Sequence, residues 1–282
     1  MSRTFRVGVR DIETEVEEAG AGPRAFLLVH GFTGSRDDFR EQMAPLGALG
    51  RTLALDQRGH GGSSNTGKAE AYALGNLVED LCGAFDALGL AQADLLGHSL
   101  GGVVALHFAL KYPARVASLV LMDTSPVPIK MRFSESARAG IAAFAREHGM
   151  GALAKRMREM AAANPALPPS QRRCEERMGS DVYWQRIERK LEAMDPVAWD
   201  TISSQFPQFP SVAERLGEIR CRTTVLVGAE DLPFLGPADQ LERGIPGARR
   251  VTIPAAAHSP QLENPAAWLE AIRAHLAWAR AG

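Results

Sequence analysis

The sequence predicts an α/β fold: a mostly parallel sheet with helices on both faces and an α-helical segment inserted between two of the strands. Short, continuous apolar runs near residues 25–30, 52–55, 93–97 and 116–122 alternate with stretches of helical periodicity. Uninterrupted apolar runs of that length are typical of parallel strands covered on both faces. Between residues 126 and 218 no long strand pattern occurs, and helical sequence rich in alanine, methionine and arginine takes its place.

The first strands and the first long helix follow from periodicity. Residues near 4–9 and 12–17 alternate between apolar and polar, which predicts an antiparallel pair at the sheet edge. Apolar residues then recur at steps of three and four from Leu74 to Leu88. This spacing predicts a helix on the sheet with Glu79, Asp80 and Asp86 facing outward.

Composition excludes several function classes. The 282 residues suffice for one large domain with an embedded insert. A formal charge of −1 gives no basic surface for nucleic acid or anionic membrane, so we expect a small-molecule substrate. The three cysteines form neither a disulfide framework nor a zinc motif, and no apolar run is long enough to span a membrane. We expect a cytoplasmic protein, and the composition indicates no oligomeric state.

The segment Gly97-His98-Ser99-Leu100-Gly101 is the strongest functional signal. It lies between an apolar run and a helical pattern, which is the layout of a nucleophile elbow. Glycines on both sides of the serine permit the sharp turn from strand to helix. Ser99 is therefore the candidate nucleophile.

A nucleophilic serine needs a base and an orienting acid, and both follow Ser99 in the expected chain order. Of the seven histidines, only His258 comes just after the final strand-like run, Val251–Ile253, because His275 lies farther on in helical sequence. Asp231 comes after the run Thr224–Val227 and is the preferred acid. Its neighbour Glu230 and Asp123, which ends an earlier run, remain alternatives.

The apolar run Phe26–Val29 leads into a His30-Gly31 loop. Such a loop places a backbone N–H beside the elbow, so the N–H groups of Phe32 and Leu100 are the candidate oxyanion hole.

These segments, together with the loop from Leu55 to Ser64, make the chain resemble the α/β-hydrolase family. The resemblance implies an eight-stranded sheet, with Ser99 after the fifth strand, Asp231 after the seventh and His258 after the eighth. It also implies a hydrolase core at residues 1–125 and 219–282 and a helical cap at residues 126–218 above the active site. Asp56 in the loop is expected to be structural, paired with Arg58.

The sequence thus predicts a cofactor-free and metal-free serine hydrolase that cleaves a small-molecule carboxylic ester through an acyl-enzyme. The segment from Gly62 to Lys68 fits the spacing of a phosphate-binding loop, but Ala69 stands where such a loop needs Ser or Thr. A serine at the elbow also argues against the related dehalogenases and epoxide hydrolases, which use Asp there.

Two alternatives remain open. The residues His30 to Ser35 are similar to those of the pyruvate-eliminating synthases of vitamin K biosynthesis, and arginines of the helical insert could meet an acidic substrate. Carbon–carbon bond hydrolases belong to the same alternative, although His98 replaces the Asn that often precedes their serine. A non-catalytic small-molecule receptor is the alternative from another class, since some proteins of this fold bind ligands with an intact triad.

Overall fold

The computed structural model describes residues 2–130, 134–164 and 168–281. An eight-stranded sheet forms its centre, with the strand order β1-β2-β4-β3-β5-β6-β7-β8. The antiparallel hairpin of β1 and β2 forms one edge, β2 pairs antiparallel with β4, and every other neighbouring pair is parallel. The predicted fold class is thereby confirmed. The strands are β1 Ser2–Val9, β2 Ile12–Ala19, β3 Ala25–Val29, β4 Thr52–Leu55, β5 Ala93–His98, β6 Val116–Met122, β7 Arg222–Gly228 and β8 Arg249–Ile253.

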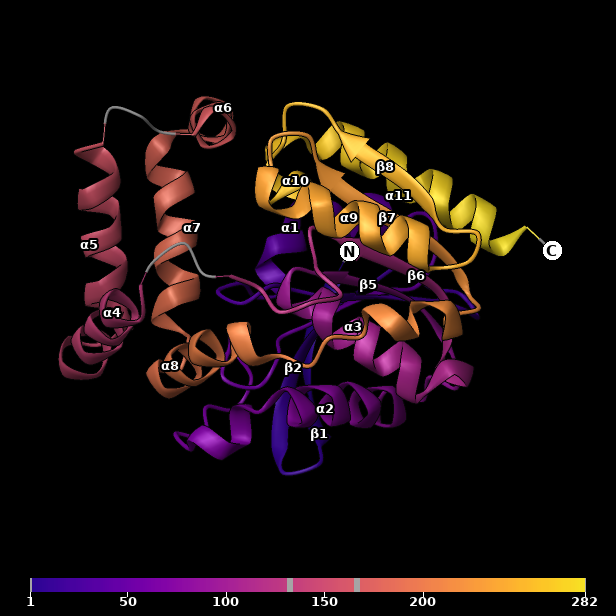
Figure 1. Cartoon of the computed structure of the whole chain (residues 1–282), viewed down its shortest axis with the longest axis horizontal. Helices are drawn as coiled ribbons and strands as arrows, with labels where there is room; N and C mark the ends of the chain where they lie inside the picture. Colours follow the sequence, from indigo (N-terminus) through magenta and orange to yellow (C-terminus); the bar gives the residue numbers. More distant parts are fainter. Residues whose placement is uncertain (1, 131–133, 165–167, 282) are drawn as a thin grey trace.

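Alternation along the central strands fills two separate cores. In β3, Leu27 and Val29 belong to the core on one face, and Phe26 and Leu28 to the core on the other. This is why the strand reads as a continuous apolar run. Helices α2, α3 and α9 cover the first face, and α1 and α11 cover the second (Figure 1). Their bounds are α1 Arg40–Gly47, α2 Leu74–Ala87, α3 Leu100–Lys111, α9 Leu232–Gly244 and α11 Pro265–Arg280, with the short α10 at Pro260–Glu263.

Between β6 and β7 the chain forms a group of helices at one end of the molecule, beyond the sheet (Figure 1). Helices α5 and α7 lie side by side there. The proline-rich sequence at residues 164–169 predicts a break between two of these helices, and residues 165–167 of it lie outside the described part of the chain. The helices are α4 Glu135–His148, α5 Met150–Ala162, α6 Pro169–Met178, α7 Ser180–Glu192 and α8 Pro196–Gln205.

Five short 3-10 turns complete the described structure. They are η1 Arg36–Phe39, η2 Ala69–Tyr72, η3 Pro113–Arg115, η4 Phe206–Gln208 and η5 Ala213–Glu218. No helix in the described ranges has both the length and the apolar character needed to cross a membrane.

Two expectations about charged residues were wrong. Asp80 does not face outward: it is buried and holds Arg58 through bonds of 2.6 and 2.7 Å. Asp56 does not pair with Arg58, but accepts hydrogen bonds from the backbone N–H groups of Arg36 and Gly62. Asp56 therefore closes the turn that follows β4, while the Arg58 guanidinium joins that turn to α2.

Because β5, β6, β7 and β8 are parallel, their carboxyl ends meet at one edge of the sheet. The residues that follow these strands are therefore brought together although they lie far apart in the sequence.

Candidate active site

Ser99 lies on a strained turn between β5 and α3. Its backbone has φ 51° and ψ −114°, a positive φ that is uncommon outside glycine. A Cβ at Gly97 would lie 2.3 Å from the carbonyl oxygen of Gly101, and one at Gly101 would lie 2.4 Å from that of Val29. Both positions thus exclude a side chain, and the elbow predicted from the sequence is present.

The structure brings Ser99 together with His258 and Asp231. The Nε2 atom of His258 lies 3.0 Å from Ser99 Oγ, and its Nδ1 lies 2.7 Å from Asp231 Oδ2. Asp231 is buried, whereas the His258 side chain is 39% exposed toward the cavity. An Nδ1–H that donates to the carboxylate leaves Nε2 free to accept the serine proton.

Gly228 allows the loop that carries His258 to lie close to the loop that carries Asp231. A Cβ at Gly228 would lie 2.0 Å from the carbonyl oxygen of Ala257, next to His258. Glu230, the alternative acid, instead forms an ion pair with Arg173 at 2.6 Å.

The loop after β3 holds the Gly31–Phe32 peptide in one orientation. His30 Nε2 accepts the backbone N–H of Gln57 at 3.0 Å, so the proton resides on Nδ1, which donates to the Gly31 carbonyl at 2.7 Å. Burial lowers the pKa of His30 to about 3, which keeps the imidazole neutral. Since C=O and N–H point in opposite directions in a trans peptide, fixing the Gly31 carbonyl also fixes the Phe32 N–H.

Leu100 supplies the second predicted N–H group. It is the first residue of α3, so its N–H has no partner within the helix. Across the described residues, no protein acceptor takes the Phe32 N–H either. Both donors are thus available beside Ser99.

Sequence reasoning gave His98 no role, but the structure places it against the site. Its Nε2 donates to the carbonyl oxygen of His258 at 2.6 Å, and burial lowers the pKa of His98 to about 4. A neutral His98 therefore anchors the loop that carries His258.

Beside Ser99 lies a cavity of about 700 Å³. Its walls come from the loop after β3, the loop after β6, the start of α9 and the helical segment between β6 and β7. The lining residues include Phe32, Ser99, Val127, Ile129, Lys130, Lys190, Phe206, Phe234, Pro237 and His258.

The cations on this cavity wall are lysines rather than the arginines considered from the sequence. Lys190 of α7 forms an ion pair with buried Asp38, and Lys130 lies on the loop after β6. Burial alone would raise the pKa of Asp38, but the charge and hydrogen bond of Lys190 hold it below its ordinary value. No arginine of the described residues lines the cavity. Several arginines of the helical segment pair with carboxylates elsewhere, among them Arg138, Arg146, Arg158, Arg173, Arg177 and Arg186.

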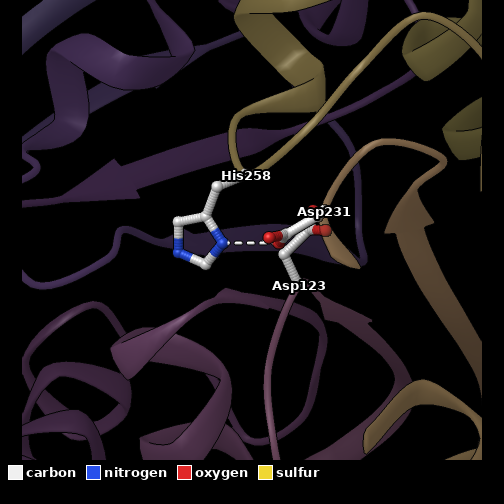
Figure 2. Close-up of side chains that lie close together, drawn as sticks. All are labelled: Asp123, Asp231 and His258. Atoms are coloured by element: carbon white, nitrogen blue, oxygen red, sulfur yellow. Dashed lines mark hydrogen bonds and ion pairs between the residues drawn. The ribbon is translucent and has the colours of Figure 1, made fainter. Parts of the chain in front are cut away.

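Asp123 lies next to Asp231 and His258, with ligand atoms of the three residues within 4.8 Å of one another (Figure 2). The partner of His258 is Asp231 rather than Asp123, since Asp231 Oδ2 accepts the hydrogen bond that His258 Nδ1 donates. Such a group could ligate a metal ion. However, His258 Nδ1 and Asp231 Oδ2 are already hydrogen-bonded to each other at 2.7 Å.

Comparison with known proteins gives matches across the chain. A family model described as the alpha/beta hydrolase fold matches residues 24–265. A protein of Bacillus subtilis (strain 168), provisionally named a 2-succinyl-6-hydroxy-2,4-cyclohexadiene-1-carboxylate synthase, is 28% identical over 256 residues, covering 88% of this chain and 89% of that protein. Bifunctional epoxide hydrolase 2 of Sus scrofa is 40% identical over 112 residues, but these span only 39% of this chain and 20% of that protein.

Solved structures include a thermophilic esterase from Thermogutta terrifontis. It superposes with a TM-score of 0.81 at 28% identity, covering 98% of this chain and 99% of that chain. An enol-lactonase from Burkholderia xenovorans LB400 has a TM-score of 0.80 at 23% identity, covering 97% of this chain and 100% of that chain, and shows likeness of fold alone.

Proposed function

The chain belongs to the α/β hydrolase family, and on that premise we propose that it is a serine hydrolase that cleaves a small-molecule carboxylic ester. The observation that carries the proposal is the unbroken hydrogen-bond chain from Ser99 Oγ through the His258 imidazole to the Asp231 carboxylate. Distances of 3.0 and 2.7 Å lie within the range over which a base withdraws a proton from a nucleophile.

The proposed reaction has two halves. His258 Nε2 takes the proton of Ser99 as the oxygen attacks the ester carbonyl, and the N–H groups of Phe32 and Leu100 stabilise the resulting oxyanion. His258 then gives its proton to the leaving alcohol. In the second half, His258 activates a water molecule that releases the acid from the acyl-enzyme. Asp231 holds the imidazole in the required tautomer throughout.

The cavity supports a small-molecule substrate. A volume of about 700 Å³ lies within the usual range of roughly 300–1,000 Å³ for small-ligand pockets. The rings of Phe32, Phe206 and Phe234 give the cavity an apolar lining. We propose that residues 126–218 act as a cap over the core of residues 1–125 and 219–282, and that cap residues at this cavity select the substrate.

A second candidate is a hydrolase or lyase that acts on an acidic carbon skeleton. The observation in its favour is the pair of cations, Lys130 and Lys190, on the cavity wall. The Bacillus subtilis relative carries the name of a synthase whose product is a carboxylate. Against it, Asp38 already neutralises Lys190.

The test is turnover on a panel of p-nitrophenyl esters of increasing acyl length, run beside acidic diene and dione substrates. We expect ester hydrolysis by the wild-type protein, an acyl adduct on Ser99 in acid-quenched samples by mass spectrometry, and neither in Ser99→Ala. Turnover of only the acidic carbon skeletons would replace the esterase proposal by the second candidate. Saturable binding of these compounds without any turnover would indicate a receptor.

A further inference from the structure

Asp123 is the buried acid that the proposed reaction leaves unused. It follows β6 directly, has φ 45° and is 1% exposed. Its backbone N–H donates to the carbonyl oxygen of Leu226, and its Oδ1 accepts the N–H of Gly228 at 2.9 Å. The Asp123 carboxyl therefore ties the end of β6 to the end of β7, just before Asp231.

The second oxygen of Asp123 has no conventional donor. Within the described part of the chain, Oδ2 is buried without a hydrogen-bond partner, which costs free energy unless the oxygen is paired. Its neighbour is the buried carboxyl of Asp231 (Figure 2). Keeping two carboxylates so close together both ionised costs free energy. A proton on Asp123 Oδ2 removes one charge and makes this oxygen a donor, with the Asp231 carboxylate as its acceptor.

The charged surroundings favour that proton. The titratable groups that face Asp123 are Asp231, His258 and, from α10, Glu263. Burial and then the charge of Asp231 raise the pKa of Asp123 well above its ordinary value. His258 is the only one of these groups that could carry a positive charge, and Asp231 already accepts its Nδ1–H.

We propose that Asp123 is protonated at neutral pH and donates a hydrogen bond to Asp231, so that it is a positioning residue for the acid of the catalytic triad. The positioning role of Asp123 rests on the proposed function, because it assumes that Asp231 is the catalytic acid. The protonation of Asp123 does not depend on the proposed function. The two carboxyls together then carry one negative charge. His258 faces one negative charge rather than two. The hydrogen bond from Asp123 fixes the Asp231 carboxylate, which in turn orients the imidazole.

The first test is the pH dependence of kcat/KM in Asp123→Asn, which keeps an N–H donor toward Asp231. If Asp123 is protonated in the wild type, this substitution removes no charge, and the acidic limb should move by less than about half a pH unit. If Asp123 is ionised, the variant removes a negative charge within 4.8 Å of His258, and the limb should move downward by on the order of two pH units. That downward shift would overturn the proposal.

The second test needs no activity. In the unfolded chain Asp123 loses its proton near its ordinary pKa, while the folded wild type retains it to higher pH. The folded state then binds more protons, so its stability falls as pH rises, and Asp123→Asn does not share this loss. Relative to the variant, the unfolding constant of the wild type should rise by up to about tenfold per pH unit between pH 5 and the folded pKa.

The matched control is Asp86→Asn, at an acid on the outer face of α2 whose side chain is 67% exposed. The free energy of unfolding of wild type, Asp123→Asn and Asp86→Asn is measured with urea from pH 5 to 8. The gap in this free energy between wild type and variant should widen with rising pH for Asp123→Asn and stay constant for Asp86→Asn. A gap of constant size would overturn the proposal. If wild type hydrolyses no ester while this gap still widens, the proposed function fails and the shared proton stands.

A measurement on the wild type decides the matter if Asp123→Asn does not fold. Infrared spectra at pH 8 should contain the carbonyl band of a protonated carboxyl group. We expect that band to weaken in folded Asp231→Asn, because loss of the neighbouring charge lowers the pKa of Asp123. A wild-type spectrum without any protonated carboxyl band at pH 8 would overturn the proposal.

Discussion

Two regions of the molecule differ in construction. One is the edge of the sheet at the carboxyl ends of β5 to β8, called the sheet edge below, which carries Ser99, Asp231 and His258. The other is the surface where helices α6 and α7 contact the core. At the sheet edge, glycines stand where a Cβ would collide with backbone, as at Gly97 and Gly228. Hydrogen bonds of 2.6 to 2.9 Å involving His30, His98 and Asp123 hold the loops there. Along the helices, long charged side chains reach the core: Arg173 to Glu230, Arg177 and Arg186 to Glu41, and Lys190 to Asp38.

This difference indicates that the sheet edge supplies the chemistry and that the helical segment adjusts the substrate preference. Backbone collisions leave the side chains at this end of the sheet little freedom. The pairs Arg173–Glu230 and Arg177–Glu41 are about one-third exposed on both sides, and ion pairs exposed to solvent are individually weak and tolerate rearrangement. We therefore expect substitutions at the sheet edge to abolish chemistry, and substitutions of exposed charges in the helical segment to change substrate preference or nothing.

The largest effect is expected from the nucleophile and the base. Ser99→Ala and His258→Ala should each lower kcat by on the order of 10⁴ to 10⁶, and the double variant should lose little more, because the two groups act as one unit. Initial rates on the best ester measure this, with His148→Ala in the exposed part of α4 as the control for a histidine substitution. Nearly wild-type turnover in purified Ser99→Ala would contradict the mechanism.

The acid comes next. Asp231→Asn keeps the size of the side chain but favours the wrong imidazole tautomer, so kcat should fall by on the order of 10⁴. Asp123→Asn should cost far less, because Asp231 rather than Asp123 bonds to His258 Nδ1. Should the two effects be reversed, Asp123 would be the acid of the triad.

This contrast shows how far the sequence could lead. Ser99, His258 and Asp231 were recognisable because each follows an apolar run, and parallel strands deliver the residues after such runs to one edge. The partners of buried charges were not recognisable. Asp80 was placed outward because it is an acid, yet it lies on a helical stripe between buried Leu77 and Ala84.

The partners of long side chains were also beyond sequence reasoning. Lys190 and Asp38 are 152 residues apart, and periodicity assigns each to an element without saying how those elements pack. His98 shows the same limit, since its bond to the His258 carbonyl depends on how closely two loops approach. Local patterns predict the strand ends, but tertiary packing decides which charged or polar groups meet across them.

Acid pH should destabilise the core around the sheet through three buried histidines. Burial lowers the pKa of His30 to about 3 and of His98 and His275 to about 4. These histidines are neutral in the fold but take up protons near pH 6.5 when unfolded. Their contribution to stability is therefore complete above pH 6.5 and is lost as pH falls toward 4, with up to about 1.4 kcal/mol per pH unit for each.

Urea unfolding between pH 7 and 5 measures this loss. His275→Gln should reduce the slope of stability against pH, since His275 bonds Thr224 and Ser118 inside the core. The control substitution is His148→Gln, at a histidine of α4 whose side chain is 48% exposed. An unchanged slope in His275→Gln would mean that this histidine is not held neutral.

The smallest effect on chemistry and the clearest effect on selectivity are expected at Phe206. Its ring lines the cavity and packs edge-on against Phe32 with centroids 5.2 Å apart. Phe206→Leu replaces the ring by a smaller side chain and leaves more room in the cavity. The ratio of kcat/KM for bulky over short acyl esters should therefore rise by about tenfold or more, because one methylene-sized change in a pocket is worth roughly 10- to 200-fold.

The control is Arg146→Gln, at an arginine that is 51% exposed and paired with Asp200 away from the cavity. It should leave kcat/KM for every neutral ester unchanged. If Arg146→Gln altered the preference as much as Phe206→Leu does, substrate choice would depend on the charged outer face of the helices, and the division between sheet edge and helical segment would need to be redrawn.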